Sequence, residues 1–282
     1  MKWRNRRVSQ NIEDRRAGGG RRPAKKVGGI SAIIITLAAM YFGIDPKIVF
    51  SLLENTGGAV SSSTNNARPS AEQKQLAQFT GVVLADTEDT WNKLFQQENI
   101  RYSEPKLVLF TDSVRSACGH AEASMGPFYC PGDHKVYIDL GFYKQLKIRH
   151  NAPGDFAQAY VIAHEIGHHV QTLLGTSAKV RKAQQGMSQA QANRLSVKLE
   201  LQADCYAGLW AYHTEKAKQI LEQGDIDEAL NAASAIGDDR LQKQARGYAT
   251  PESFTHGTSQ QRVYWFKKGF TDGTLRGCNT FS

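Results

Sequence analysis

After residue 70, apolar side chains recur mostly at the three-to-four-residue spacing of amphipathic helices. The first such helix is predicted over 71–98, where Ser70 and, three residues later, Gln73 are typical of a capped helix start. Gly81 is expected to interrupt this helix, because glycine is a poor helix former.

Two short runs rich in β-branched and aromatic residues predict strands at 106–110 and 135–139. Asp155 is the expected cap of the next helix. The remaining periodic segments predict helices over 155–172, from Ser188 past Trp210, over 225–236, over 238–245, and from Thr258 to Phe270. The pattern therefore predicts an α+β domain that is mostly helical with a small sheet, and it extends over 70–282.

One apolar run has no polar face. Residues 28–44 carry no charge and end at Asp45-Pro46. Their length is at the lower limit of the roughly 17–25 residues that span a bilayer. We predict one N-terminal transmembrane segment, a signal anchor over 28–45 that contacts the lipid bilayer. A cleaved signal peptide and a buried core helix are the alternatives.

The net charge of +8 is concentrated before this run. Residues 1–27 hold ten basic and two acidic side chains, so acidic and basic groups balance in the rest of the chain. A basic flank before an apolar run predicts that this arm stays cytoplasmic and that the following domain is exported. Trp3 is the only aromatic residue in the arm, so we expect no nucleic-acid partner, although an Arg-rich nucleic-acid binder stays an alternative.

Residues 46–69 form the predicted linker between the apolar run and the domain. They include Gly57-Gly58 and the polar run 61–66, Ser-Ser-Ser-Thr-Asn-Asn. Such a composition is typical of a flexible connection.

Four cysteines, an even number, suit an oxidising compartment. Cys118 and Cys130 bracket a loop that contains glycine and proline and are expected to pair. Cys205 and Cys278 would then form a second disulfide. Four reduced thiols are the alternative, and zinc binding by cysteine is disfavoured because the chain has no Cys-x-x-Cys.

The segment His164-Glu165-Ile166-Gly167-His168 carries the clearest chemical signal. Two histidines four residues apart lie on one face of a helix, so both imidazoles can bind one metal ion. Glu165 is then the candidate base that activates a water molecule. This pattern predicts a catalytic Zn²⁺ site with His164 and His168 as ligands.

A third ligand is expected from a later helix. A further histidine ten residues after His164 is excluded, because position 174 is Leu174. Glu200 and Asp204 lie four residues apart on one predicted helix face, so Glu200 can bind the ion while Asp204 accepts a hydrogen bond from a ligand imidazole. A solvated pair of surface carboxylates is the alternative.

This constellation resembles the gluzincin metallopeptidases and, more closely, the bacterial neutral zinc metallopeptidases of the YpfJ type. The likeness covers nearly the whole chain. It is carried by Phe42-Gly-Ile-Asp-Pro46, Gly126-Pro-Phe-Tyr-Cys-Pro131, His164-Glu-Ile-Gly-His-His169, Glu200-Leu-Gln-Ala-Asp-Cys205 and Phe254-Thr-His-Gly-Thr-Ser259. The resemblance implies a zincin-like fold and, with the predicted anchor, a bacterial inner-membrane protein whose domain faces the periplasm.

The resemblance also implies two further site residues. His256 is the candidate donor to the oxyanion, with Tyr248 as a second possibility. Tyr137, on the predicted strand 135–139, is the candidate substrate-binding residue on an edge strand to which a peptide would add. A plain core strand is the alternative.

Together these features predict a membrane-anchored zinc peptidase that acts on a peptide or protein substrate. The alternative from another class is a catalytically silent, zinc-stabilised binding or scaffold module with the same fold.

Overall fold

The computed structural model describes residues 1–16 and 69–282, which form one compact unit. This unit consists of strands, helices and 3₁₀ turns. Its strands are β1 (Ile12–Asp14), β2 (Lys106–Phe110), β3 (Ser113–Ser116), β4 (Gly119–Glu122), β5 (Phe128–Cys130) and β6 (Lys135–Asp139). Its helices are α3 (Ala71–Gln97), α4 (Gly141–Arg149), α5 (Asp155–Leu173), α6 (Thr176–Gln184), α7 (Gln189–Lys218), α8 (Asp225–Ala235), α9 (Asp238–Arg246) and α10 (Ser259–Asp272), with 3₁₀ turns η1 (Ala123–Met125), η2 (Pro251–Ser253) and η3 (Arg276–Cys278).

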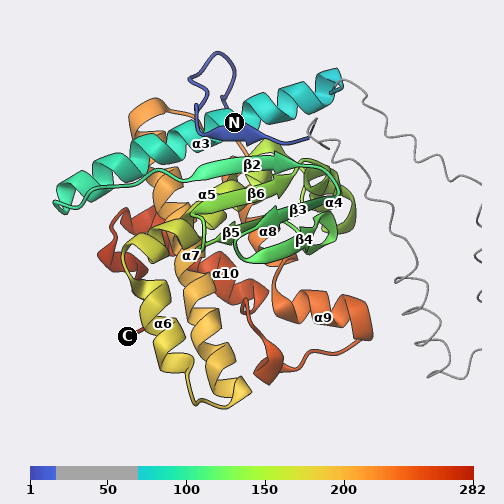
Figure 1. Ribbon diagram of the computed structural model, residues 1–282, viewed down its shortest axis with the longest axis vertical. Coiled ribbons are helices and arrows are strands. Elements are labelled where there is room, and N and C mark those ends of the chain that lie inside the picture. Colours follow the sequence, from blue (N-terminus) through green and yellow to red (C-terminus); the bar gives the residue numbers. More distant parts are fainter. Residues whose placement is uncertain (17–68) are drawn as a thin grey trace, which may run out of the picture. The chain divides into compact units, whose positions relative to one another are not determined.

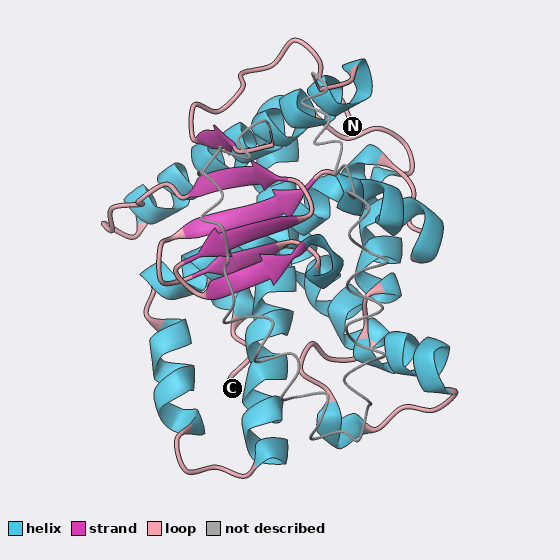
Figure 2. Cartoon of the chain, turned by 45° about the vertical axis from the view of Figure 1, so that its right-hand side comes forward, coloured by secondary structure: helices cyan, strands magenta, loops and turns pink. Residues whose placement is uncertain are grey.

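The main sheet in the described part of the chain has the strand order β1-β2-β6-β5. β1, β2 and β6 are parallel, whereas β5 runs antiparallel to β6 at the edge of the sheet. The hairpin β3–β4 forms a second, two-stranded sheet. Helices cover the sheet and extend well beyond it, so the predicted mostly helical α+β architecture is confirmed (Figure 2).

The predicted strands 106–110 and 135–139 match β2 and β6, and the six predicted helices match α3, α5, α7, α8, α9 and α10. Two details of the predicted helices are wrong, the cap at Asp155 and the interruption at Gly81. Asp155 is the first residue of α5, and Gly154 takes the cap position. α3 continues unbroken through Gly81, where residues 8–9 cross it: Ser9 N–H donates to the Gly81 carbonyl at 2.9 Å, and a Cβ on Gly81 would lie 2.5 Å from a Val8 methyl.

Residues 1–16 belong to the domain. β1 extends the sheet beside β2, and the N-terminal segment runs along α3 (Figure 1). The Met1 amino group lies 2.6 Å from an Asp155 carboxylate oxygen and 3.2 Å from one of Asp225. Arg6 and Arg7 pair with the buried carboxylates Asp86 and Glu88 of α3, so acidic groups of the domain neutralise part of the basic charge of the arm.

The predicted membrane topology is therefore corrected. It required residues 1–27 and the domain to lie on opposite sides of a membrane, but residues 1–16 pack into the same compact unit as 69–282. The predicted span, 28–45, and most of the predicted linker lie outside the described residues. Among the residues that the structure describes, no helix combines the length and the apolar character needed to cross a bilayer.

The helices α5, α7 and α10 pack together beside the sheet. α7 and α10 approach most closely at Gly208 and Gly269. A Cβ on Gly269 would overlap the Cys205 carbonyl oxygen, and one on Gly208 would overlap the Phe266 carbonyl oxygen. Glycine at both positions therefore lets the two backbones come into direct contact.

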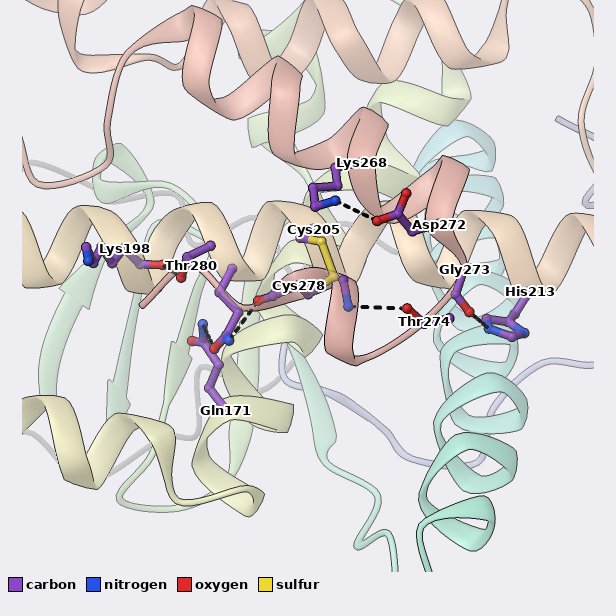
Figure 3. Close-up of a disulfide and its surroundings, with 12 residues drawn as sticks. Gln171, Lys198, Cys205, His213, Lys268, Asp272, Gly273, Thr274, Cys278 and Thr280 are labelled. Carbon is purple, nitrogen blue, oxygen red and sulfur yellow. Dashed lines mark hydrogen bonds and ion pairs between the residues drawn. A yellow bond between two sulfur atoms is a disulfide. The ribbon is translucent and has the colours of Figure 1, made fainter. Parts of the chain in front are cut away.

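Both predicted disulfides are confirmed. Cys118 pairs with Cys130 and so joins the end of the β3–β4 turn to β5. Cys205 pairs with Cys278, which ties the C-terminal segment to the middle of α7 (Figure 3). Thr280 strengthens this attachment, because its hydroxyl donates to the Lys198 carbonyl at 2.6 Å. The segment of α7 between these two points carries Glu200 and Asp204.

We predict that Gly269→Ala destabilises the protein. Alanine in place of glycine normally stabilises a helix by about 1 kcal/mol, but here the methyl group would collide with the backbone of α7. The overlap should reverse the sign and cost about 1–3 kcal/mol of the free energy of unfolding, as measured by urea denaturation. The control is Lys267→Ala on the exposed face of the same helix, and a stabilised Gly269→Ala variant would contradict the proposed close contact.

Candidate metal centre

His164, Glu165 and His168 lie on α5. This helix is buried on most of its faces because its sequence is largely apolar. Phe156, Ala163, Ile166 and Val170 are almost completely shielded from solvent. The helix therefore lies in the core with its two histidines one turn apart, and their rings meet edge to face with centroids 4.8 Å apart.

Three side chains present their ligand atoms to one point. The His164 Nε2 and His168 Nε2 atoms lie 3.2 Å apart, and the Glu200 carboxylate oxygens lie 3.1 Å from His164 Nε2 and 3.3 Å from His168 Nε2. A tetrahedral zinc ion with bonds of about 2.0–2.1 Å separates neighbouring ligand atoms by about 3.3 Å. The spacing of the three groups fits such an ion.

The other nitrogen of each ring already has an acceptor. His164 Nδ1 lies 2.8 Å from Asp204 Oδ1, and His168 Nδ1 lies 3.0 Å from Gln171 Oε1. The Gln171 amide is itself oriented, since its nitrogen donates to the Leu199 carbonyl at 2.7 Å. With both Nδ1 protons donated in this way, the neutral rings direct their Nε2 lone pairs at each other and at Glu200, an arrangement that a cation stabilises.

Asp204 is held by a buried network. Arg262, from α10, donates to both of its carboxylate oxygens, at 2.9 and 3.0 Å, and the Tyr160 hydroxyl donates to Oδ1. All three side chains are at most 2% exposed. Burial acts to raise the pKa of Asp204, but Arg262 and His164 outweigh it and lower the pKa, so Asp204 is a carboxylate.

The same charges act on the histidines of the metal-free protein. Burial acts to lower the pKa of His164, but the Asp204 and Glu200 carboxylates outweigh it and raise the pKa to about 10. Burial likewise acts to raise the pKa of Glu200, and the two histidines lower it well below its usual range. The site therefore favours positive charge among its three ligand atoms, and a divalent cation supplies that charge when it replaces the protons.

The three groups open onto a cleft of about 710 Å³. Glu165 also lines it and is 9% exposed. The segment from η1 into β5 lines the cleft as well, including Gly126, Phe128 and Tyr129. The cleft therefore gives a substrate access to the metal-binding point, to Glu165 and to the edge strand.

His256 lies on the same cleft, in the loop before α10. Asp238, at the start of α9, accepts the backbone N–H groups of Thr255, His256 and Gly257 and lies 3.3 Å from His256 Nδ1. The hydrogen bond to Asp238 is the main cause of a raised pKa of His256, which favours the protonated ring.

Two residues predicted for the site are placed elsewhere. The Tyr137 ring is buried and stacks on Phe128 at 4.8 Å, and its hydroxyl donates to Asp133. Because β6 lies between β2 and β5, the prediction that Tyr137 marks the edge strand is wrong, and β5 holds that place. Tyr248 is exposed under the Arg246 guanidinium and does not line the cleft.

His169 takes no part in the group of three side chains that could hold a metal ion. Its Nε2–H donates to the Ser103 carbonyl at 2.6 Å, and its Nδ1 accepts from the Tyr129 hydroxyl at 3.0 Å. Burial lowers the pKa of His169 to about 4, so the ring is neutral. It joins β5 to α5 directly behind the cleft.

Three residues that support the site, Gln171, Tyr160 and Arg262, were not predicted from the sequence. Gln171 follows His168 by three residues and Tyr160 precedes His164 by four, so helical spacing could have indicated both. Arg262 is almost a hundred residues from His164, and only the packing of α10 on α7 brings it to Asp204.

Comparison with known proteins agrees with this geometry. Residues 1–281 match the family described as "Putative neutral zinc metallopeptidase", and the chain belongs to that family. The "Uncharacterized protein YpfJ" of Escherichia coli K12 is 51% identical over 290 residues, covering 100% of this chain and 99% of that protein. The "Uncharacterized protein Rv2575" of Mycobacterium tuberculosis is 39% identical over 258 residues, covering 86% of this chain and 85% of that protein. No solved structure matches the chain.

The family name implies zinc, and the donor set of two imidazole nitrogens and one carboxylate suits that ion. We predict that Asp204→Asn weakens zinc binding by about 10–100-fold, because the ligand ring loses its carboxylate partner. Zinc affinity would be measured by competition with a chelator on protein shown to be folded by circular dichroism. Asp272→Asn, which removes an exposed carboxylate of α10, is the control, and an unchanged affinity in Asp204→Asn would contradict the assigned role.

We also predict different effects for two Tyr→Phe substitutions next to His169. Tyr129→Phe removes the donor to a buried ring nitrogen and should lower the free energy of unfolding by about 1 kcal/mol or more. Tyr102→Phe removes a buried hydroxyl that has no hydrogen-bond partner in the described part of the chain, so stability should not fall. Thermal unfolding of the two variants provides the comparison, and equal losses would contradict the inferred link.

Proposed function

We propose that this protein is a zinc-dependent peptidase with one catalytic zinc ion held by His164, His168 and Glu200. The observation that carries the proposal is the convergence of three acceptor groups on one point that faces a cleft containing Glu165. Bound zinc would polarise the scissile carbonyl group and lower the pKa of a water molecule towards neutrality.

Glu165 is the proposed general base. It follows a ligand histidine directly and lines the cleft, yet it lies outside the group of three side chains that could hold the ion. A carboxylate in this place takes a proton from the attacking water and passes it to the leaving amine.

His256 is the proposed donor to the oxyanion. Asp238 engages its Nδ1 side and the backbone around it, which fixes the ring at the wall of the cleft. Its remaining nitrogen can then donate to the carbonyl oxygen on which negative charge develops, and the raised pKa favours the protonated, donating form.

The proposed substrate is a peptide in extended conformation. Among the strands that the structure describes, β5 pairs with β6 alone, and residues around β5 line the cleft. An added strand could hydrogen-bond with the free side of β5 and so present one peptide bond to the metal-binding point.

The decisive experiment is Glu165→Gln in the full chain. We expect this variant to keep one zinc ion per chain by metal analysis and to lose peptide cleavage by at least about 10³-fold, since the base is removed while the ligands stay. Cleavage would be followed by mass spectrometry on an unfolded protein and a peptide library.

Glu122→Gln, on the exposed strand β4, is the matched control and should cleave normally. Unchanged cleavage by zinc-loaded Glu165→Gln would contradict the mechanism. A zinc-loaded native protein that releases no fragments from either substrate would favour the scaffold function instead.

A further inference from the structure

The charges that line the cleft do not balance once the site holds a divalent ion. The lining carboxylates are Glu165 and Glu200, and together they offset the two charges of the ion. The lining guanidinium of Arg262 is offset by Asp204 directly behind it. His256, which a raised pKa favours as a cation, lies beside the Asp238 carboxylate. Arg149 is then the remaining charged side chain in the lining, and no carboxylate of the lining compensates it.

Arg149 contributes to the lining from α4. It is the last residue of that helix, and His150, next to it, also lines the cleft just before the chain enters α5. Leu241 of α9 contributes to the lining as well, and Figure 1 shows the helices α4 and α9 on the same side of the molecule. We call the lining residues from these two elements the α4–α9 side of the cleft.

A second arginine, Arg240, directly precedes the lining residue Leu241 in α9. Burial is the main cause of a lowered pKa of His150, and the charges of Arg240 and Arg149 lower it further. Neither arginine forms an ion pair with another described residue, and the buried Nδ1 of His150 has no hydrogen-bond partner there. Arg149 therefore carries an uncompensated charge and His150 an unused hydrogen-bonding nitrogen, and a bound anion would relieve both conditions.

The rest of the cleft has a different character. The α6 side is lined by uncharged polar groups, among them Thr172, Ser177 and Gln184. Apolar rings line the cleft as well, Phe128 from β5 and Phe142 from α4. Arg149 is thus the uncompensated basic side chain of this lining.

We propose that the α4–α9 side of the cleft, where Arg149 and His150 line it, binds a carboxylate group of the substrate. The preferred peptides would carry either an acidic side chain or their own C-terminal carboxylate a few residues from the bond that is cut. Arginine suits this task, because its planar guanidinium can bind both carboxylate oxygens at once. This inference rests on the proposed function, since it names the substrate class of the same cleft.

The test measures binding separately from cleavage. The zinc-loaded Glu165→Gln protein is titrated with fluorescent peptides of one sequence in four forms: C-terminal carboxylate or amide, each with glutamate or glutamine at one internal position scanned along the peptide. We expect at least one carboxylate form to bind about five- to tenfold more tightly than the doubly neutral peptide, with a difference that shrinks at high salt. Tighter binding of the peptide with the C-terminal carboxylate, or of the peptide with the internal glutamate, shows which of the two carboxylates is recognised.

Arg149→Gln in the same background should abolish this difference, and Arg149→Lys should keep part of it. Arg149→Glu should reverse the preference in favour of a peptide with lysine at the same position. Lys147→Gln is the matched control, since it removes an exposed charge from the same helix but does not line the cleft. Equal binding of all four peptides, or a preference that persists when Arg149 and Arg240 are both replaced by glutamine, would overturn the proposal.

The two proposals fail in different ways. If native protein cuts neutral and acidic peptides with equal kcat/KM, and the cutting depends on Glu165, the carboxylate site is overturned and the peptidase function stands. If native protein cuts nothing but binds acidic peptides through Arg149, the peptidase function is overturned and the carboxylate site stands.

Discussion

Two ring nitrogens and a carboxylate that face one another at 3.1–3.3 Å need positive charge between them, and much of the surrounding structure maintains this arrangement. The outer nitrogens of the rings are committed to Asp204 and Gln171. Asp204 in turn depends on Arg262, and both are buried, so the loss of either one would leave an uncompensated charge in the core. The metal-binding point, α7 and α10 are therefore coupled by electrostatics.

The packing of α7 on α10 also keeps Arg262 next to Asp204. The contact at Gly208 and Gly269 brings the backbones of α7 and α10 together, and one turn from it Arg262 reaches Asp204. The Cys205–Cys278 disulfide then secures the C-terminal segment to the part of α7 that carries the acidic residues. At the far side of the domain, residues 1–16 add β1 to the sheet and place their arginines against acidic groups of α3, which gives the basic N-terminus a structural role in the described unit.

Local patterns in the sequence predicted the longer helices and the functional groups that lie together on a single helix. The capping residues Ser70 and Ser188 start α3 and α7 where spacing predicted, because a cap needs only its own first turn. The pair His164 and His168 was readable for the same reason: helical geometry alone places them on one face. Short elements such as β5 and α6 were missed, since three to nine residues contain too little periodicity.

The sequence by itself thus determined the helical framework, both disulfide pairs and the candidate metal-binding residues, since these follow from spacing within one element or from a small set of cysteines. Only the tertiary structure decided that β5 instead of β6 forms the sheet edge, that Arg262 supports Asp204, and that residues 1–16 join the domain instead of leaving it across a membrane. Each of these depends on contacts between segments far apart in the chain. Such contacts are selected by the packing of whole surfaces, and no local pattern of residues records them.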